Sequence, residues 1–177
     1  AEIRNQVVAD NPTKIHDLTF LRTEVLFKII TATGVAQEQA RSLALETFSV
    51  FFKGRNDVAF FPGALEMLDV LSQRYTLFAL TNGNADVEQV GIAKFLAGAV
   101  SSADVGASKP NKLMFEAVLA KAGATADQCI HVGDHLTDDI AGAKNAGMHT
   151  LWVNLTGHKP NPYQAIANIE VTNLEQL

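Results

Sequence analysis

Three carboxylates lie close together in one stretch of the chain: Asp134, Asp138 and Asp139. They follow the short apolar run Cys129 to Val132 and precede a small-residue helical pattern, an order that predicts a strand, an acidic turn and a helix. Carboxylate oxygens suit a hard cation, and Mg²⁺ is the usual choice where a phosphate is also bound. In the alternative interpretation Asp138 caps the helix and Asp134 is a solvated turn residue.

Two further segments could bind an anion. Thr81-Asn82-Gly83 ends a predicted strand with a hydroxyl and a sharply turned backbone whose amides could face an anion, although Asn-Gly is also common in plain turns. Lys109, in Ser108-Lys109-Pro110-Asn111, stands just before a predicted helix, where the helix dipole disfavours a cation. A bound anion or a neighbouring carboxylate explains such a lysine better than local structure does.

The elements that would position these residues follow from the apolar spacing. The first sixty residues predict helices, and after Gly63 short apolar runs alternate with helices. Each connection is too long for a hairpin and long enough for a crossover, which predicts parallel strands. The expected strands are Leu77–Leu80, Ala99–Ser102, Ile130–Val132, Thr150–Val153 and Ile169–Val171. The expected helices are one that starts at Pro12-Thr13 and ends at Gly34, one from about Ala36 through Phe52, Ala64–Gln73, one from about Asp86, Asn111–Lys121 and Asp138–Asn145.

These patterns predict an α/β fold with a parallel, Rossmann-like sheet, residues 61–177, preceded by a helical insertion, residues 1–60. Ala1 to Asn11 gives no clear pattern. The 177 residues are 47% hydrophobic and 19% charged with a net charge of −5, and no basic cluster suggests a nucleic-acid surface. No apolar run reaches the roughly 20 residues of a membrane helix. The single cysteine, Cys129, in a strand expected to be buried, favours a reducing compartment, so a cytoplasmic location is expected.

The order of Thr81, Lys109, Asp134 and Asp139 resembles motifs two to four of the haloacid dehalogenase-like hydrolases. The similar pieces are Phe61-Pro62-Gly63-Ala64, Leu80-Thr81-Asn82-Gly83, Ser108-Lys109-Pro110-Asn111, and Val132-Gly133-Asp134 with Asp139 and Gly142. The helices before Phe60 resemble part of the family's helical cap. Within the family, His16-Asp17, Thr81 to Asn84 and Gly133 to Thr137 look most like bacterial flavin-nucleotide and riboflavin-pathway sugar phosphatases.

The resemblance implies a Mg²⁺-dependent phosphomonoester hydrolase that forms an aspartyl phosphate and acts on a small phosphorylated metabolite. Thr81 and Lys109 would be catalytic, and Thr81, Asn82, Gly83 and Lys109 would bind the phosphoryl group. Asp134 would bind the metal, and Asp139 would bind it through water or orient Lys109. Asp138 could replace Asp139 in that role.

The family's first motif, Asp-x-Asp-x-Thr after an apolar strand, has no match in this chain. Asp10-Asn11-Pro12-Thr13 comes nearest, with one aspartate and an intervening proline. We therefore expect that the α/β core lacks its first strand and that the cap lacks its first helix. Both missing elements would lie upstream of Ala1. In the family that strand lies between the ones ending at Thr81 and Asp134, so Leu77–Leu80 and Ile130–Val132 should not pair.

Two alternative functions stay open. Carbon–halogen hydrolysis needs no metal, but dehalogenases of this family resemble one another in having serine where Asp134 stands. A non-catalytic binding or regulatory module is the other alternative. Three residue types have simpler explanations: His131 and His135 are too separated for a shared zinc site, Phe48, Phe51 and Phe52 are expected to pack in a core rather than face a substrate ring, and Trp152 needs only a partner for its N–H.

Overall fold

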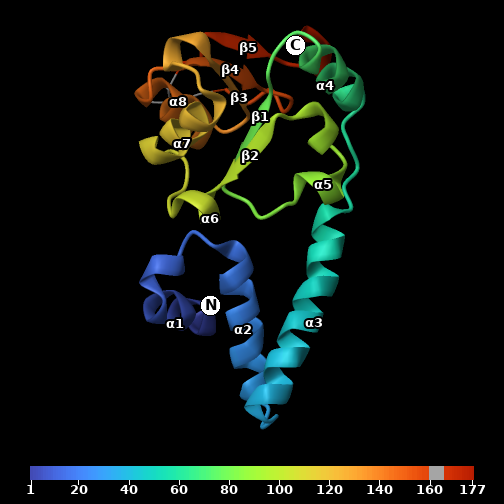
Figure 1. Cartoon of the computed structure of the whole chain (residues 1–177), viewed down its shortest axis with the longest axis vertical. Helices are drawn as coiled ribbons and strands as arrows, with labels where there is room; N and C mark the ends of the chain where they lie inside the picture. The colour runs from blue at the N-terminus through green and yellow to red at the C-terminus, as the bar shows by residue number, and fades with distance from the viewer. Residues whose placement is uncertain (160–165) are drawn as a thin grey trace.

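The computed structural model describes residues 1–159 and 166–177, which form a helical segment and an α/β layer (Figure 1). The helical segment contains α1 (Glu2–Asp10), a 3₁₀ turn (Pro12–Lys14), α2 (Leu18–Thr31) and α3 (Gln37–Asn56). The α/β layer contains α4 (Ala64–Ser72), β1 (Phe78–Thr81), α5 (Val87–Val90), 3₁₀ turn Ala93–Phe95, β2 (Gly98–Ser101), α6 (Ser102–Val105), α7 (Lys112–Ala122), 3₁₀ turn Ala126–Gln128, β3 (Ile130–Gly133), π-helix Leu136–Ala141, α8 (Gly142–Asn145), β4 (His149–Val153), β5 (Ile169–Val171) and 3₁₀ turn Leu174–Gln176. No helix within the described ranges is both long and apolar enough to cross a membrane.

The strands form two separate parallel sheets, as expected from the sequence. β1 pairs with β2, and β4 pairs with β3 on one side and β5 on the other. β1 and β3, which end at the two halves of the candidate site, are not hydrogen-bonded to each other. On β3 the large apolar side chains of Ile130 and Val132 are exposed by 47% and 44%. This strand was expected to be buried, and it is not, because only its other face, which carries His131, packs against a helix. Cys129 lies just before β3 and is half-buried.

The helical segment differs from the sequence prediction at both ends. Residues 2–10, where no pattern was apparent, form α1, which packs by the fully buried Val7, and Lys28 of α2 pairs with Asp10 at 2.6 Å. The predicted polar break at Gly54 to Val58 is also wrong at its start, because α3 continues to Asn56. The buried Asn56 amide donates to the carbonyl of Phe52, and its oxygen accepts from the N–H of Asp86. The hydrogen bond between Asn56 and Asp86 thus stabilises the last turn of α3 and joins this helix to the α/β layer.

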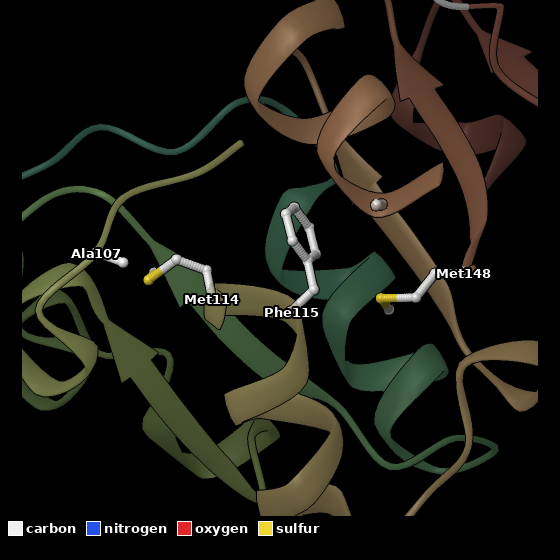
Figure 2. Packing of buried hydrophobic residues seen from close by; sticks show 5 residues of the cluster. Ala107, Met114, Phe115 and Met148 are labelled. Atoms are coloured by element: carbon white, nitrogen blue, oxygen red, sulfur yellow. The ribbon is translucent and has the colours of Figure 1, made fainter. Parts of the chain in front are cut away.

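The core of the α/β layer lies between α7, α8 and β4. Phe115 of α7 is fully buried there, with Met114, Met148, Ala107 and Ala143 (Figure 2). Gly142 is required at the start of α8, since a Cβ there would lie 2.7 Å from the Phe115 ring and 3.0 Å from the Cα of Pro110. This close packing fixes the loop that carries Lys109, the residue before Pro110.

Gly142→Ala should therefore lower stability by about 1–3 kcal/mol through overpacking. Gly54→Ala is the matched control, because nothing lies within 4 Å of a Cβ there and α3 gains helix propensity. Thermal unfolding of both variants tests this: Gly142→Ala should lower the melting temperature, and Gly54→Ala should keep or raise it. Equal melting temperatures would show that Gly142 is not a packing constraint.

Candidate active site

The ammonium of Lys109 joins the two sheets at their carboxyl ends. Its Nζ donates to the carbonyl of Leu80, in β1, at 2.9 Å and to Oδ1 of Asp139, which follows β3, at 2.6 Å. Both side chains are largely buried, at 11% and 6% exposed. The unusual lysine before a helix is thus explained by a neighbouring carboxylate, one of the two explanations offered by the sequence.

Three donors hold the Asp139 carboxylate. Oδ1 also lies 2.9 Å from Nε2 of His131, and Oδ2 accepts the backbone N–H of His135 at 3.0 Å. Burial raises the pKa of Asp139, but hydrogen bonds from His131 and Lys109, with the charge of Lys109, outweigh it and hold the pKa well below its ordinary value. Asp139 is consequently ionised at neutral pH and fixed in orientation.

Gly133 allows this carboxylate to approach the end of β3. A Cβ on Gly133 would lie 2.4–2.6 Å from the side chain of Asp139, so only glycine fits under it. The sequence assigns no role in the site to His131, but its side chain is buried, contacts Asp139 and packs edge-on against Phe115. The sequence signal that could have identified it is the alternation along β3, which puts His131 and Gly133 on one face.

The backbone of Lys109 is held by the side chain of Asn82. The Asn82 amide oxygen accepts from the Lys109 N–H at 2.7 Å, and its NH₂ donates to the Lys109 carbonyl at 3.0 Å. Asn82 was predicted to bind phosphate, and because its side chain holds the Lys109 backbone, we expect its backbone N–H to make that contact. The neighbouring Gly83 N–H donates to the Thr81 hydroxyl oxygen at 2.8 Å, closing a tight turn after β1.

The predicted metal residues differ in their surroundings. Asp134 is exposed at the turn after β3, and its carbonyl accepts the indole N–H of Trp152 at 2.9 Å, the partner that Trp152 was expected to need. An open cleft of about 510 Å³ borders Asp134, with Phe61 and His158 among its walls. Asp138 does not contact Lys109; its Oδ1 lies 3.7 Å from Nδ1 of His135.

The helix after this turn begins earlier than predicted and in a different form. A π-helical turn, Leu136–Ala141, precedes α8, and the side chain of His135 accepts the N–H of Asp138 at its start. The cap is therefore His135, and the expectation that the helix begins at Asp138 is wrong. The wider turn places Asp139 inward and Asp138 outward, as their burial shows.

Comparisons with known proteins agree with these motifs. A family model described as haloacid dehalogenase-like hydrolase matches residues 4–147. The 5-amino-6-(5-phospho-D-ribitylamino)uracil phosphatase YigB of Escherichia coli is 28% identical over 151 residues, 85% of this chain and 63% of the relative. The phosphoserine phosphatase of Thermus thermophilus is 29% identical over 162 residues, 88% and 63% of the two chains. The chain thus spans about 63% of the length of these relatives.

A solved structure is more similar. The 2-haloacid dehalogenase from Pseudomonas syringae pv. Tomato DC3000 is 38% identical and superposes with a TM-score of 0.94, covering 99% of this chain and 76% of its own. A putative hydrolase of the same family from Bacillus subtilis, bound to magnesium, has a TM-score of 0.67 at 22% identity, a likeness of fold. The α/β Rossmann-like fold is thereby confirmed.

Asp139→Asn should destabilise the chain by about 3–5 kcal/mol at neutral pH, because it leaves the buried Lys109 ammonium without its counter-charge. The folded pKa of Asp139 is depressed, so its contribution is present above the unfolded pKa of about 3.9 and is lost as pH falls through the lower, folded value. Urea unfolding of both proteins from pH 7 downward should show their stabilities converging only in strong acid. Asp57→Asn, an exposed aspartate at the end of α3, is the control, and a constant difference at every pH would contradict this assignment.

Asn82→Ala should loosen the Lys109 loop, at a cost of about 1–3 kcal/mol for the two lost hydrogen bonds. Hydrogen exchange checks this directly. The Lys109 amide should exchange faster in the variant, whereas the amide of Leu113, which bonds to the Asn111 side chain, should not change. Equal acceleration at both amides would indicate general unfolding.

Proposed function

This chain belongs to the haloacid dehalogenase-like hydrolase family, and from that premise we propose that the complete protein is a Mg²⁺-dependent phosphomonoester hydrolase. It acts through an aspartyl phosphate on a small phosphorylated metabolite. The observation that carries the proposal is the Lys109 ammonium, bonded both to the end of β1 and to Asp139. Ligands of parallel α/β sheets bind at the carboxyl ends of the strands, and a fixed cation at this edge favours an anionic ligand.

Thr81 and Lys109 act on the phosphoryl group in this proposal. The Thr81 hydroxyl and the backbone amides of Asn82 and Gly83 donate to phosphoryl oxygens, once the Gly83 N–H turns from Thr81 to the ligand. Lys109 offsets the charge of nucleophile and phosphate, which otherwise repel each other. Asp139 and Asn82 are the residues that orient it.

Asp134 is the proposed ligand of Mg²⁺. Its exposed carboxylate borders the cleft after β3, and Mg²⁺ often takes one or two carboxylates with waters and a phosphate. Within the described ranges no group of three potential ligand side chains surrounds it, which fits that mode of binding rather than an all-protein cage. When bound there, the ion would neutralise developing charge on the phosphoryl oxygens.

The nucleophile in this proposal is an aspartate on a strand between β1 and β3. Among the described residues, the facing edges of these strands have no partner strand. Unpaired backbone groups on both edges favour a strand in that position. The nucleophilic carboxylate oxygen displaces the alcohol from phosphorus, and water then releases phosphate from the aspartyl ester. The helical segment serves as a partial cap.

A haloacid dehalogenase is the second candidate, because a 38% identical solved structure carries that name. The Asp134 carboxylate weighs against it, since a second anion near the nucleophile opposes the binding of a haloacid carboxylate unless a metal neutralises it. A non-catalytic module is the third candidate. The phosphatase relatives favour the first, and the cytoplasmic location expected from the sequence stays a prediction.

One assay separates these candidates. The complete protein should hydrolyse 4-nitrophenyl phosphate with Mg²⁺ and lose activity in excess EDTA, while this chain alone should be inactive. Asp134→Asn should lower Mg²⁺-dependent turnover at least about 100-fold, and Asp127→Asn, on an exposed turn that does not line the cleft, should leave it unchanged.

Chloride release from 2-chloropropionate, insensitive to EDTA, would instead establish the dehalogenase. Inactivity of both proteins on both substrates would favour the non-catalytic module. Full activity of Asp134→Asn would exclude Asp134 as the main metal ligand.

A further inference from the structure

Two arginines of the helical segment meet the loop that follows β1. Arg22 of α2 donates from Nη1 to Oδ1 of Asn84 at 2.5 Å. Arg55, in the last turn of α3, has Nη2 3.7 Å from the position that a Cβ on Gly83 would occupy. The Thr81 hydroxyl oxygen is 3.2 Å from the same position, so Arg55 and Thr81 lie on one side of the Gly83 backbone.

Arg22 is half-buried without a carboxylate partner among residues 1–159 and 166–177. Its guanidinium lies over the Phe51 ring, 4.8 Å from the centroid. Burial lowers the pKa of Arg22, and the charge of the nearby Arg55 lowers it further. Both effects oppose the cation, so this position costs free energy in the absence of an anion.

Arg41, on the same helical hairpin, shows the contrasting arrangement. Its guanidinium also lies over an aromatic ring, that of Phe27, at 3.8 Å, but it forms an ion pair with Glu24. The hairpin therefore provides a carboxylate where an arginine has a structural role. At Arg22 the hairpin provides a second arginine, and the loop after β1 provides a neutral amide, Asn84, which orients the guanidinium without neutralising it.

We propose that Arg22 and Arg55 bind a second anionic group of the substrate, a carboxylate or a further phosphate, next to the phosphoryl group held at Thr81. Guanidinium groups bind both anions through paired N–H donors, and the Phe51 ring and Asn84 fix one of them in advance. This inference rests on the proposed function. The preferred substrates are then small phosphomonoesters that carry another negative charge.

A matched pair of substrates tests the inference in the complete protein. 3-Phosphoglycerate and glycerol 3-phosphate differ only in a carboxylate that replaces a hydroxymethyl group. Charge-assisted hydrogen bonds are worth about 1.5–3 kcal/mol, or roughly 10- to 100-fold. We therefore expect kcat/KM to be at least about tenfold higher for 3-phosphoglycerate, and Arg22→Gln or Arg55→Gln to remove this preference. Arg74→Gln, an exposed arginine after α4, should preserve it.

Arg55 is exposed, so Arg55→Gln should fold even if Arg22→Gln is unstable. Equal values of kcat/KM for the two substrates in the unmodified protein would overturn the inference. So would an equal loss on both substrates in the arginine variants, which would mean that the arginines bind the transferred phosphoryl group itself.

Calorimetric binding keeps this test independent of catalysis. With Mg²⁺, the complete protein should bind 3-phosphonopropionate at least about tenfold more tightly than propylphosphonate, and Arg55→Gln should abolish the difference. If no phosphate ester is hydrolysed but this difference persists, the anion site stands and the proposed function fails. If the two phosphonates bind equally, or neither binds, the anion site is refuted.

Discussion

The buried ion pair between Lys109 and Asp139 is the constraint on which the site depends. Lys109 lies in the loop before α7 and Asp139 in the π-helical turn after β3, and the Lys109 ammonium also bonds to the carbonyl of Leu80, so one side chain connects β1 with the turn after β3. Burying two charges costs more than their attraction returns unless other donors complete the geometry. His131 and the His135 amide supply those donors, and Asn82 holds the lysine backbone. The pair therefore stands at the centre of a network in which each polar group is satisfied.

The packing around the pair follows from the same requirement. Gly133 lets the Asp139 side chain lie against the strand end, and Gly142 lets α8 approach Phe115 and the Lys109 loop. Larger side chains at either glycine would separate the lysine from its carboxylate. Gly133 and Gly142 thus allow the two charged side chains to approach each other, although neither glycine contributes a polar side chain.

The sequence predicted the positions of the strands along the chain, because strand ends and turn residues are local signals. The two unpaired edges and the contact of Lys109 with Asp139 were expected from the resemblance to the hydrolase family. It did not predict α1, whose formation depends on packing of Val7 and on the Lys28–Asp10 pair, or the extension of α3 through Asn56. It also missed His131 and the amide of Asn82, whose partners lie 8 and 27 residues away. Such contacts depend on how turns bring segments together, which periodicity does not report. The sequence left open whether Asp138 or Asp139 orients Lys109, and the π-helical turn places Asp139 against the Lys109 ammonium.

Charge balance connects the ion pair with the two arginines. Because Asp139 is ionised and lies against the Lys109 ammonium, Lys109 can offset only part of the charge of a nucleophile and a phosphate. In the proposed reaction, a phosphate dianion approached by a carboxylate nucleophile needs further positive charge, which a Mg²⁺ ion held by the exposed Asp134 would supply. Any additional anionic group on the substrate would exceed what one Mg²⁺ and Lys109 can offset. Arg22 and Arg55, beside the same loop and without carboxylate partners among the described residues, would supply that further positive charge, and an anion bound there would offset the cost of burying Arg22.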